Sequence, residues 1–174
     1  AGLLHEVAAP SPSDEARREL SRVRGAAKDD ERRAKQRLSK FLLRQGRTYT
    51  AGKVAWTQKH LLWLERQKFV DPNLQLTFDL LLRALTQAQD RVRELDKAIA
   101  TASGDEAVRE AVALLRCFKG IDTITAFGLV TELHGFERFG SPRALMAFVG
   151  MTPSEHSSGG TRKQAGITKA GNSR

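Results

Sequence analysis

Apolar residues recur at alternating steps of four and three between residues 72 and 100, and polar residues fill most of the positions between them. The recurring residues are Leu74, Phe78, Leu81, Leu85, Ala88, Val92, Leu95 and Ile99. This heptad pattern is typical of a helix that packs along one seam against another helix. Asp71-Pro72 predicts the start of the helix, because proline is favoured in a first helical turn. The partner is either another helix of the chain, in an antiparallel hairpin, or a second subunit. We favour a hairpin that also forms a homo-oligomer through residues 72–100.

A second long helix is predicted from Ser13, with Asp14 and Glu15 near the positive end of its dipole, to about Leu43, before Gly46. One face carries the apolar residues Leu20, Val23, Ala27, Ala34, Leu38 and Phe41. The other faces carry the cations Arg17, Arg18, Arg22, Arg24, Lys28, Arg32, Arg33, Lys35, Arg37, Lys40 and Arg44. Singly, these cations are ordinary solvated side chains. As a set they predict a basic ridge that could follow a nucleic-acid backbone.

Shorter helices are predicted over residues 54–68, 107–117 and up to about Leu133, and from Pro142 to Gly150. In the first of these helices we interpret Trp56 and Trp63 as packing residues and His60 as a partly buried polar residue. The predicted fold class is therefore all-α. A long helical coiled-coil hairpin precedes a small helical domain with a glycine-rich basic C-terminal segment.

Residues 107–133 resemble a helix-hairpin-helix unit, in which amides at the start of the second helix face a phosphate. The turn centres on Gly120-Ile121, and the predicted DNA-binding residues here are Lys119, Gly120 and Thr123. Strict examples of the motif have glycine where this chain has Asp122, which could cap the second helix instead. A phosphate site and a purely structural hairpin are both open readings.

The net charge, the apolar runs and the cysteine and histidine content limit which partners and which cell compartment are expected. The 174 residues carry a formal net charge of +9, which favours a polyanionic partner, with nucleic acid preferred to a membrane surface. No apolar run approaches the roughly 20 residues that span a bilayer. Cys117 is the only cysteine, so no internal disulfide can form and a reducing cytoplasm is expected. The four histidines lack metal-ligand spacing, and no cofactor or metal is expected to bind these residues.

The last 25 residues, from Gly150, combine hydroxyls, glycines and cations, with no acidic residue after Glu155. They contain too few apolar residues to form an amphipathic helix. Glycine-freed amides and cations suit a phosphate, although a solvated tail has the same composition. The candidate DNA-binding residues of the segment are Gly159, Gly160, Arg162, Lys163, Lys169 and Arg174.

Several short motifs follow one another in a specific order. They are Phe118-Lys119-Gly120-Ile121, Thr131-Glu132-Leu133, Phe136-Glu137-Arg138-Phe139, Leu145-Met146-Ala147-Phe148-Val149-Gly150-Met151-Thr152-Pro153, His156-Ser157-Ser158-Gly159-Gly160 and Ile167-Thr168-Lys169-Ala170-Gly171-Asn172. Over about residues 111–174 the chain thus resembles the C-terminal domain of the insertion sequence 110 family, the DEDD transposases. The basic helix and the heptad helix are similar to the connecting coiled-coil segment of that family.

The resemblance implies a bacterial, nucleoid-associated recombinase that binds DNA and an element-encoded guide RNA. It implies that magnesium binds an acidic tetrad in an N-terminal nuclease domain that is not among these residues. Residues 1–13 then read as the remnant of that domain and a linker, residues 14–100 as the coiled-coil region, and residues 101–174 as an incomplete transposase domain.

The family's serine nucleophile corresponds to Ser158, with Ser157 as the alternative. A serine needs activation and charge stabilisation to attack a phosphodiester, and the resemblance makes Arg162, Lys163 and Lys169 candidates for that stabilisation. His156 is either a base or, as we favour, a residue that packs or contacts DNA. A non-catalytic nucleic-acid-binding coiled-coil module and a structural adaptor remain the competing hypotheses.

Overall fold

The computed structural model describes residues 10–52, 54–155, 158 and 164–168, and within them the chain is predominantly helical. The elements are α1 (Pro12–Arg44), α2 (Gln58–Glu65), α3 (Pro72–Ala102), α4 (Glu106–Arg116), α5 (Thr123–Leu133), α6 (Pro142–Phe148), β1 (Pro153–Glu155) and β2 (Gln164–Ile167). The all-α class is confirmed. The helix predicted over residues 54–68 is shorter at both ends, and the two short strands were not expected.

Local signals set the ends of the two long helices. Asp71 caps α3, and its carboxylate accepts hydrogen bonds from the amides of Asn73 and Leu74 at 2.8 and 3.0 Å. α1 begins earlier than predicted, because Ser11 rather than Ser13 is its N-cap and accepts from the Asp14 amide at 3.2 Å. After the C-cap of α1, Gly46 adopts a positive φ of 67°, which glycine tolerates best.

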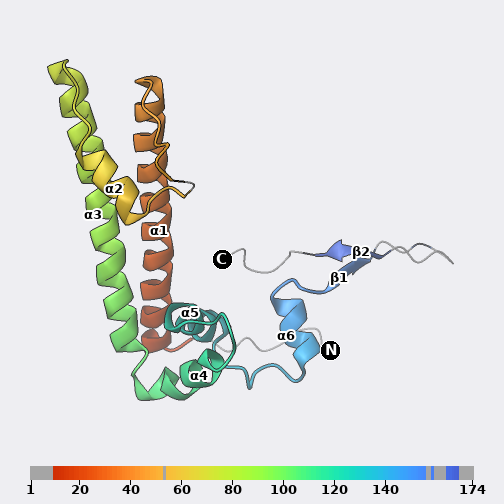
Figure 1. Ribbon diagram of the computed structural model, residues 1–174. Coiled ribbons are helices and arrows are strands. Elements are labelled where there is room, and N and C mark those ends of the chain that lie inside the picture. Colours follow the sequence, from red (N-terminus) through yellow and green to blue (C-terminus); the bar gives the residue numbers. More distant parts are fainter. Residues whose placement is uncertain (1–9, 53, 156–157, 159–163, 169–174) are drawn as a thin grey trace.

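α1 and α3 lie side by side in opposite directions and form the long hairpin (Figure 1). The residues of α3 that are buried, Phe78, Leu85, Val92 and Ile99, are separated by seven positions each. In the half of the hairpin that carries α2, Phe78 and Leu85 pack in one core with Leu38 and Phe41 of α1. The heptad stripe is therefore occupied within the chain, as the hairpin alternative required, whereas supercoiling of the two helices stays a prediction.

The seam of α1 differs from the predicted apolar face at two positions. Val23 was predicted to lie on the apolar face but is 49% exposed. The steps of four and three between the buried residues of α1 place Arg24, rather than Val23, on the side that faces α3. The guanidinium of Arg24 reaches across to α3 and donates to Asp96 at 2.8 Å. Glu31 also lies in the seam and is buried, and its carboxylate lies 2.6 Å from the ammonium groups of both Lys28 and Lys35.

α2 covers the far end of the hairpin through an aromatic cluster. His60 is buried between Trp56 and Trp63, and its Nδ1 accepts a hydrogen bond from the Trp56 amide at 2.9 Å. Burial lowers the pKa of His60. Both tryptophans pack against the hairpin core, which agrees with the interpretation of them as packing residues.

A second core joins the other end of the hairpin to α4 and α5. Ile99 of α3 packs there with Val112 of α4 and Phe127 of α5, and Leu20 of α1 covers them. Arg22 strengthens this junction by donating to Glu132 of α5 at 3.1 Å. The beginning of α1 and the end of α3 thus share a core with the following helices.

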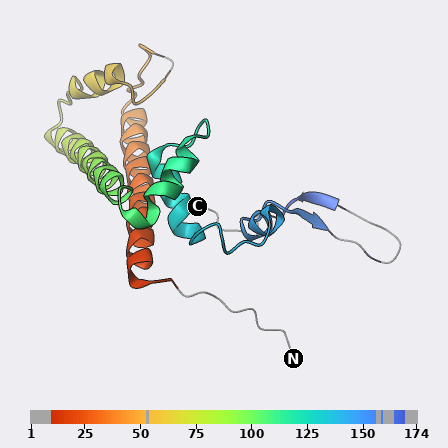
Figure 2. The ribbon, with the colours of Figure 1, turned by 90° about the horizontal axis from the view of Figure 1, so that it is seen from below.

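α6 and the β1–β2 pair stand to one side of this helical body (Figures 1 and 2). Within the described ranges, α6 makes no close backbone contact with helices α1 to α5. None of the described helices is long and apolar enough to span a membrane.

The seam predicts that substitutions of two leucines of α3 lower the free energy of unfolding by different amounts. Leu85 is only 1% exposed and Leu80 is 51% exposed. Leu85→Asp should lower the free energy of unfolding by at least about 3 kcal/mol, since it removes a packed side chain and buries a charge. In the monomer at low protein concentration, Leu80→Asp should change it by less than about 0.5 kcal/mol. Urea unfolding followed by circular dichroism measures both, and equal midpoints would contradict the seam.

Candidate functional site

The turn between α4 and α5 brings together the three candidate residues of the helix-hairpin-helix-like unit. Gly120 has a positive φ of 93°, so the turn requires a residue that tolerates this conformation. Lys119 beside it is exposed, and Thr123 opens α5 and is half-buried. Phe118 is 65% exposed at the same turn, and the sequence interpretation had not singled it out. The turn itself therefore presents one cation and one aromatic ring to solvent.

Asp122 is the N-cap of α5, which is the alternative that the sequence left open. Its carboxylate accepts a hydrogen bond from the Thr125 amide at 2.7 Å, and this bond is the main cause of its lowered pKa. The carboxylate carries negative charge at the helix end that a phosphate would approach. Contact of a phosphate with Lys119, Gly120 and Thr123 stays a prediction, and Asp122 opposes it electrostatically.

The C-terminal segment forms a two-stranded antiparallel sheet, which supplies the scaffold that its composition could not. β1 pairs with β2 between Pro153 and Ile167 and between Glu155 and Gln164. The Ser154 hydroxyl donates to the Gly166 carbonyl at 2.9 Å. These contacts hold Glu155 and Gln164 close together.

Thr168 ties this sheet to the end of α6. Its amide donates to the Thr152 carbonyl at 2.9 Å, and its hydroxyl donates to the Gly150 carbonyl at 3.1 Å. Gly150 itself has a positive φ of 72°. Ser154 and Thr168 thus have a positioning role that the sequence interpretation did not assign.

α6 carries its own small cluster below the sheet. Ser141 caps the helix by accepting from the Ala144 amide at 3.2 Å. The guanidinium of Arg138 lies 4.7 Å from the ring centre of Phe139 and 4.5 Å from that of Phe148. Because these contacts are local, α6 and the strands keep their relation to each other without support from the helical hairpin.

Ser158 is exposed in the connection between β1 and β2. The other candidates of the segment lie outside the described residues; they are Ser157, Gly159, Gly160, Arg162, Lys163, Lys169 and Arg174, together with His156. The described part of the site thus offers a serine hydroxyl that a large substrate can reach.

Among the described residues, no group of three or more His, Cys, Asp or Glu side chains could hold a metal ion. The described residues alone therefore do not fit a magnesium ion.

The sequence of this region matches a known family. Residues 112–174 match the transposase family IS116/IS110/IS902. Residues 112–174 therefore carry a transposase domain of this insertion-sequence family. The match includes α5, α6, both strands and Ser158, and it begins within α4.

Similarity to curated relatives extends beyond this domain. The chain is 38% identical over its full length to a putative transposase, y4qE, of Sinorhizobium fredii, and it covers 41% of that protein. It is 34% identical over 139 residues, 80% of its own length, to the transposase for insertion sequence element IS1533 of Leptospira borgpetersenii, of which it covers 40%. It is 26% identical over 168 residues, 97% of its length, to the transposase for IS1328 of Yersinia enterocolitica, of which it covers 49%. The chain therefore spans less than half the length of these relatives.

The Asp122 cap predicts a pH-dependent stability difference. Asp122→Ala should lower the free energy of unfolding by about 1 kcal/mol at pH 7, because one helix-end amide loses its acceptor. The pKa of Asp122 is lower in the folded chain than in the unfolded chain. Its contribution is therefore complete above the unfolded pKa and is lost as the pH falls through the folded pKa. Chemical unfolding between pH 7 and pH 2 should show the difference shrinking below about pH 4.

Asp122→Asn is the matched control, because asparagine caps a helix without a charge. Its stability should follow the wild type at neutral pH. Tighter binding of duplex DNA by this variant would favour the phosphate-binding reading of the turn. Unchanged binding would favour the structural one.

Proposed function

We propose that this chain is part of a transposase that binds DNA of an insertion sequence and cuts and rejoins its strands through a serine nucleophile. The observation that carries the proposal is the position of Ser158. It lies in the region that matches the family, it is exposed, and it stands between two strands that are paired with each other and tied to the end of α6. An exposed hydroxyl between two fixed strands is accessible to a nucleic-acid backbone.

The proposed reaction is a transesterification. The Ser158 Oγ loses its proton and forms a bond to the phosphorus of a DNA phosphodiester, while one phosphorus–oxygen bond to deoxyribose breaks and that sugar oxygen takes a proton. A sugar hydroxyl of another strand then attacks the phosphoserine and restores the serine hydroxyl. The bond energy is conserved, so strands can rejoin without a high-energy cofactor.

Charge stabilisation is the second requirement of this reaction, because negative charge develops on the phosphoryl oxygens. Arg162, Lys163 and Lys169 are the candidate cations, on the basis of the sequence and the family resemblance. Gly159 and Gly160 would let the DNA backbone come close. Ser157 remains the alternative nucleophile.

The proposal extends to the whole protein and its surroundings. In a larger transposase, a separate N-terminal nuclease domain would bind magnesium. An element-encoded RNA would guide the enzyme. It would work in the bacterial cytoplasm at the nucleoid. The alternative is a non-catalytic module in which the same surfaces bind nucleic acid without covalent chemistry.

Trapping the covalent intermediate separates these functions. A full-length transposase with its DNA should yield a protein–DNA adduct that peptide mass spectrometry places on Ser158. Ser158→Ala should abolish the adduct, whereas Ser157→Ala should retain it. Adduct in Ser158→Ala and none in Ser157→Ala would move the nucleophile to Ser157. No adduct from a wild-type protein that still binds DNA would favour the non-catalytic module.

We also propose a homo-oligomer through the exposed side of α3. The heptad stripe is occupied by α1, but Leu76 and Leu80 are 59% and 51% exposed outside it. Leu76→Glu with Leu80→Glu should dissociate the oligomer without unfolding the hairpin, as measured by light scattering and circular dichroism. Arg83→Gln on the same helix is the control. An unchanged mass for the double variant would contradict this contact.

A further inference from the structure

The eleven cations of α1 divide sharply into a paired group and an unpaired group. The eight from Arg17 to Lys35 all lie within 4 Å of a carboxylate. Several of these carboxylates stand three residues earlier on the same helix, and others belong to α3 or α5. Among the residues that the structure describes, no carboxylate forms an ion pair with Arg37, Lys40 or Arg44. We call these last three residues the distal strip.

The local sequence explains why the distal strip has no acidic partner. Residues 32–64 contain no aspartate or glutamate, although they include nine lysines and arginines. The distal strip follows the steps i, i+3 and i+7, which place its members on one side of the helix over about 10 Å. Like charges at these spacings repel by a few tenths of a kcal/mol per pair. The charge of Arg37 does act on the Asp30 carboxylate, but that carboxylate accepts its hydrogen bond from Arg33. An external polyanion would relieve the remaining repulsion.

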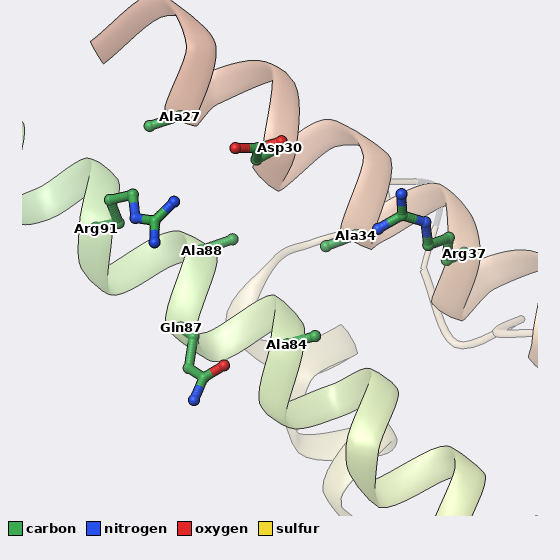
Figure 3. A pocket seen from close by; sticks show the side chains of 8 residues that line it. All are labelled: Ala27, Asp30, Ala34, Arg37, Ala84, Gln87, Ala88 and Arg91. Atoms are coloured by element: carbon green, nitrogen blue, oxygen red, sulfur yellow. The ribbon is translucent and has the colours of Figure 1, made fainter. Parts of the chain in front are cut away.

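Arg37 of the distal strip borders a groove between α1 and α3. Figure 3 shows Ala27 and Ala34 of α1 and Ala84 and Ala88 of α3 along this groove, with Arg37 and Arg91 towards its two ends. Small side chains keep the groove open. Asp30 is the one acid in its lining, and it already bonds to Arg33 at 2.7 Å.

Arg37 also lines a second depression farther along the same helix pair. Lys40, Arg44 and Arg33 border it, and its apolar lining includes Phe41 and Leu81. The α3 residues at the two depressions are neutral apart from Arg91. The surface is thus continuous and strongly positive, with a neutral opposite wall that does not compete with an incoming anion.

We infer that the distal strip of Arg37, Lys40 and Arg44 binds the phosphate backbone of double-stranded DNA. This site is separate from the turn at Gly120 and from Ser158. The row of about 10 Å matches the axial distance over which one DNA strand presents about three phosphates. DNA is the polyanion that an insertion-sequence transposase must handle, so this inference rests on the proposed function. Backbone contacts of this kind position a protein and carry no sequence preference.

The test is the salt dependence of DNA binding by the intact chain. Fluorescence anisotropy with a 30-base-pair duplex of arbitrary sequence would compare wild type with Arg37→Gln/Lys40→Gln/Arg44→Gln. Three lost phosphate contacts should reduce the slope of log K against log salt by about 2.7 and weaken binding at 0.1 M salt at least about tenfold. Arg83→Gln/Lys97→Gln/Arg109→Gln removes the same charge from exposed cations outside the groove. It should reduce the slope by less than about 1.

The other outcomes are distinct. Equal losses in the two triple variants would overturn the site, since only net charge would then matter. Arg37→Lys/Arg44→Lys keeps both charges and should retain the wild-type slope; a loss here would also overturn a purely electrostatic contact. Weakened binding of duplex RNA without weakened binding of DNA would overturn the assignment to DNA. If wild type binds no DNA at all, the proposed function fails before the site is tested.

Discussion

The apolar seam between α1 and α3 is the interaction on which the rest of the structure depends. Helices of 33 and 31 residues in water gain most of their stability from packing one face rather than from intrinsic propensity. Leu38, Phe78 and Leu85 are almost completely buried along this seam, and each such side chain contributes about 1.5–3 kcal/mol. Ile99 continues the same stripe into the second core, so the seam also determines where α4 and α5 attach.

Glu31 lies in the seam between the part of α1 whose cations form ion pairs and the part whose cations do not. Burial raises the pKa of Glu31, but hydrogen bonds from Lys28 and Lys35 outweigh it and leave the pKa below its ordinary value. The carboxylate is therefore ionised at neutral pH and forms ion pairs with two neighbouring cations. It is the last acid before a long basic stretch. One half of the helix thus uses its cations for internal ion pairs, while the other half leaves them to solvent or to a partner.

The two strands on either side of Ser158 are held in place by contacts of their own. β1, β2 and α6 hold together through Ser154, Thr168 and the stacked Arg138, and none of these contacts involves the helical hairpin. The distal strip therefore lies on the helical hairpin, whereas Ser158 lies between the two strands beside it (Figure 1). A long nucleic acid could contact both, and the short link after α5 limits how far they can separate.

The sequence alone determined the features that depend on neighbours a few residues away. These include the heptad stripe of α3, the Asp71 cap and the glycine after α1. It could not decide between Asp122 as a cap and a phosphate site, because that choice depends on where one carboxylate points. Tertiary structure placed Arg24 rather than Val23 at the seam, paired four cations of α1 with acids up to 114 positions away, and joined the two strands on either side of Ser158. Such outcomes depend on which helix faces which, and that is set by packing energy summed over the whole chain rather than by any local pattern.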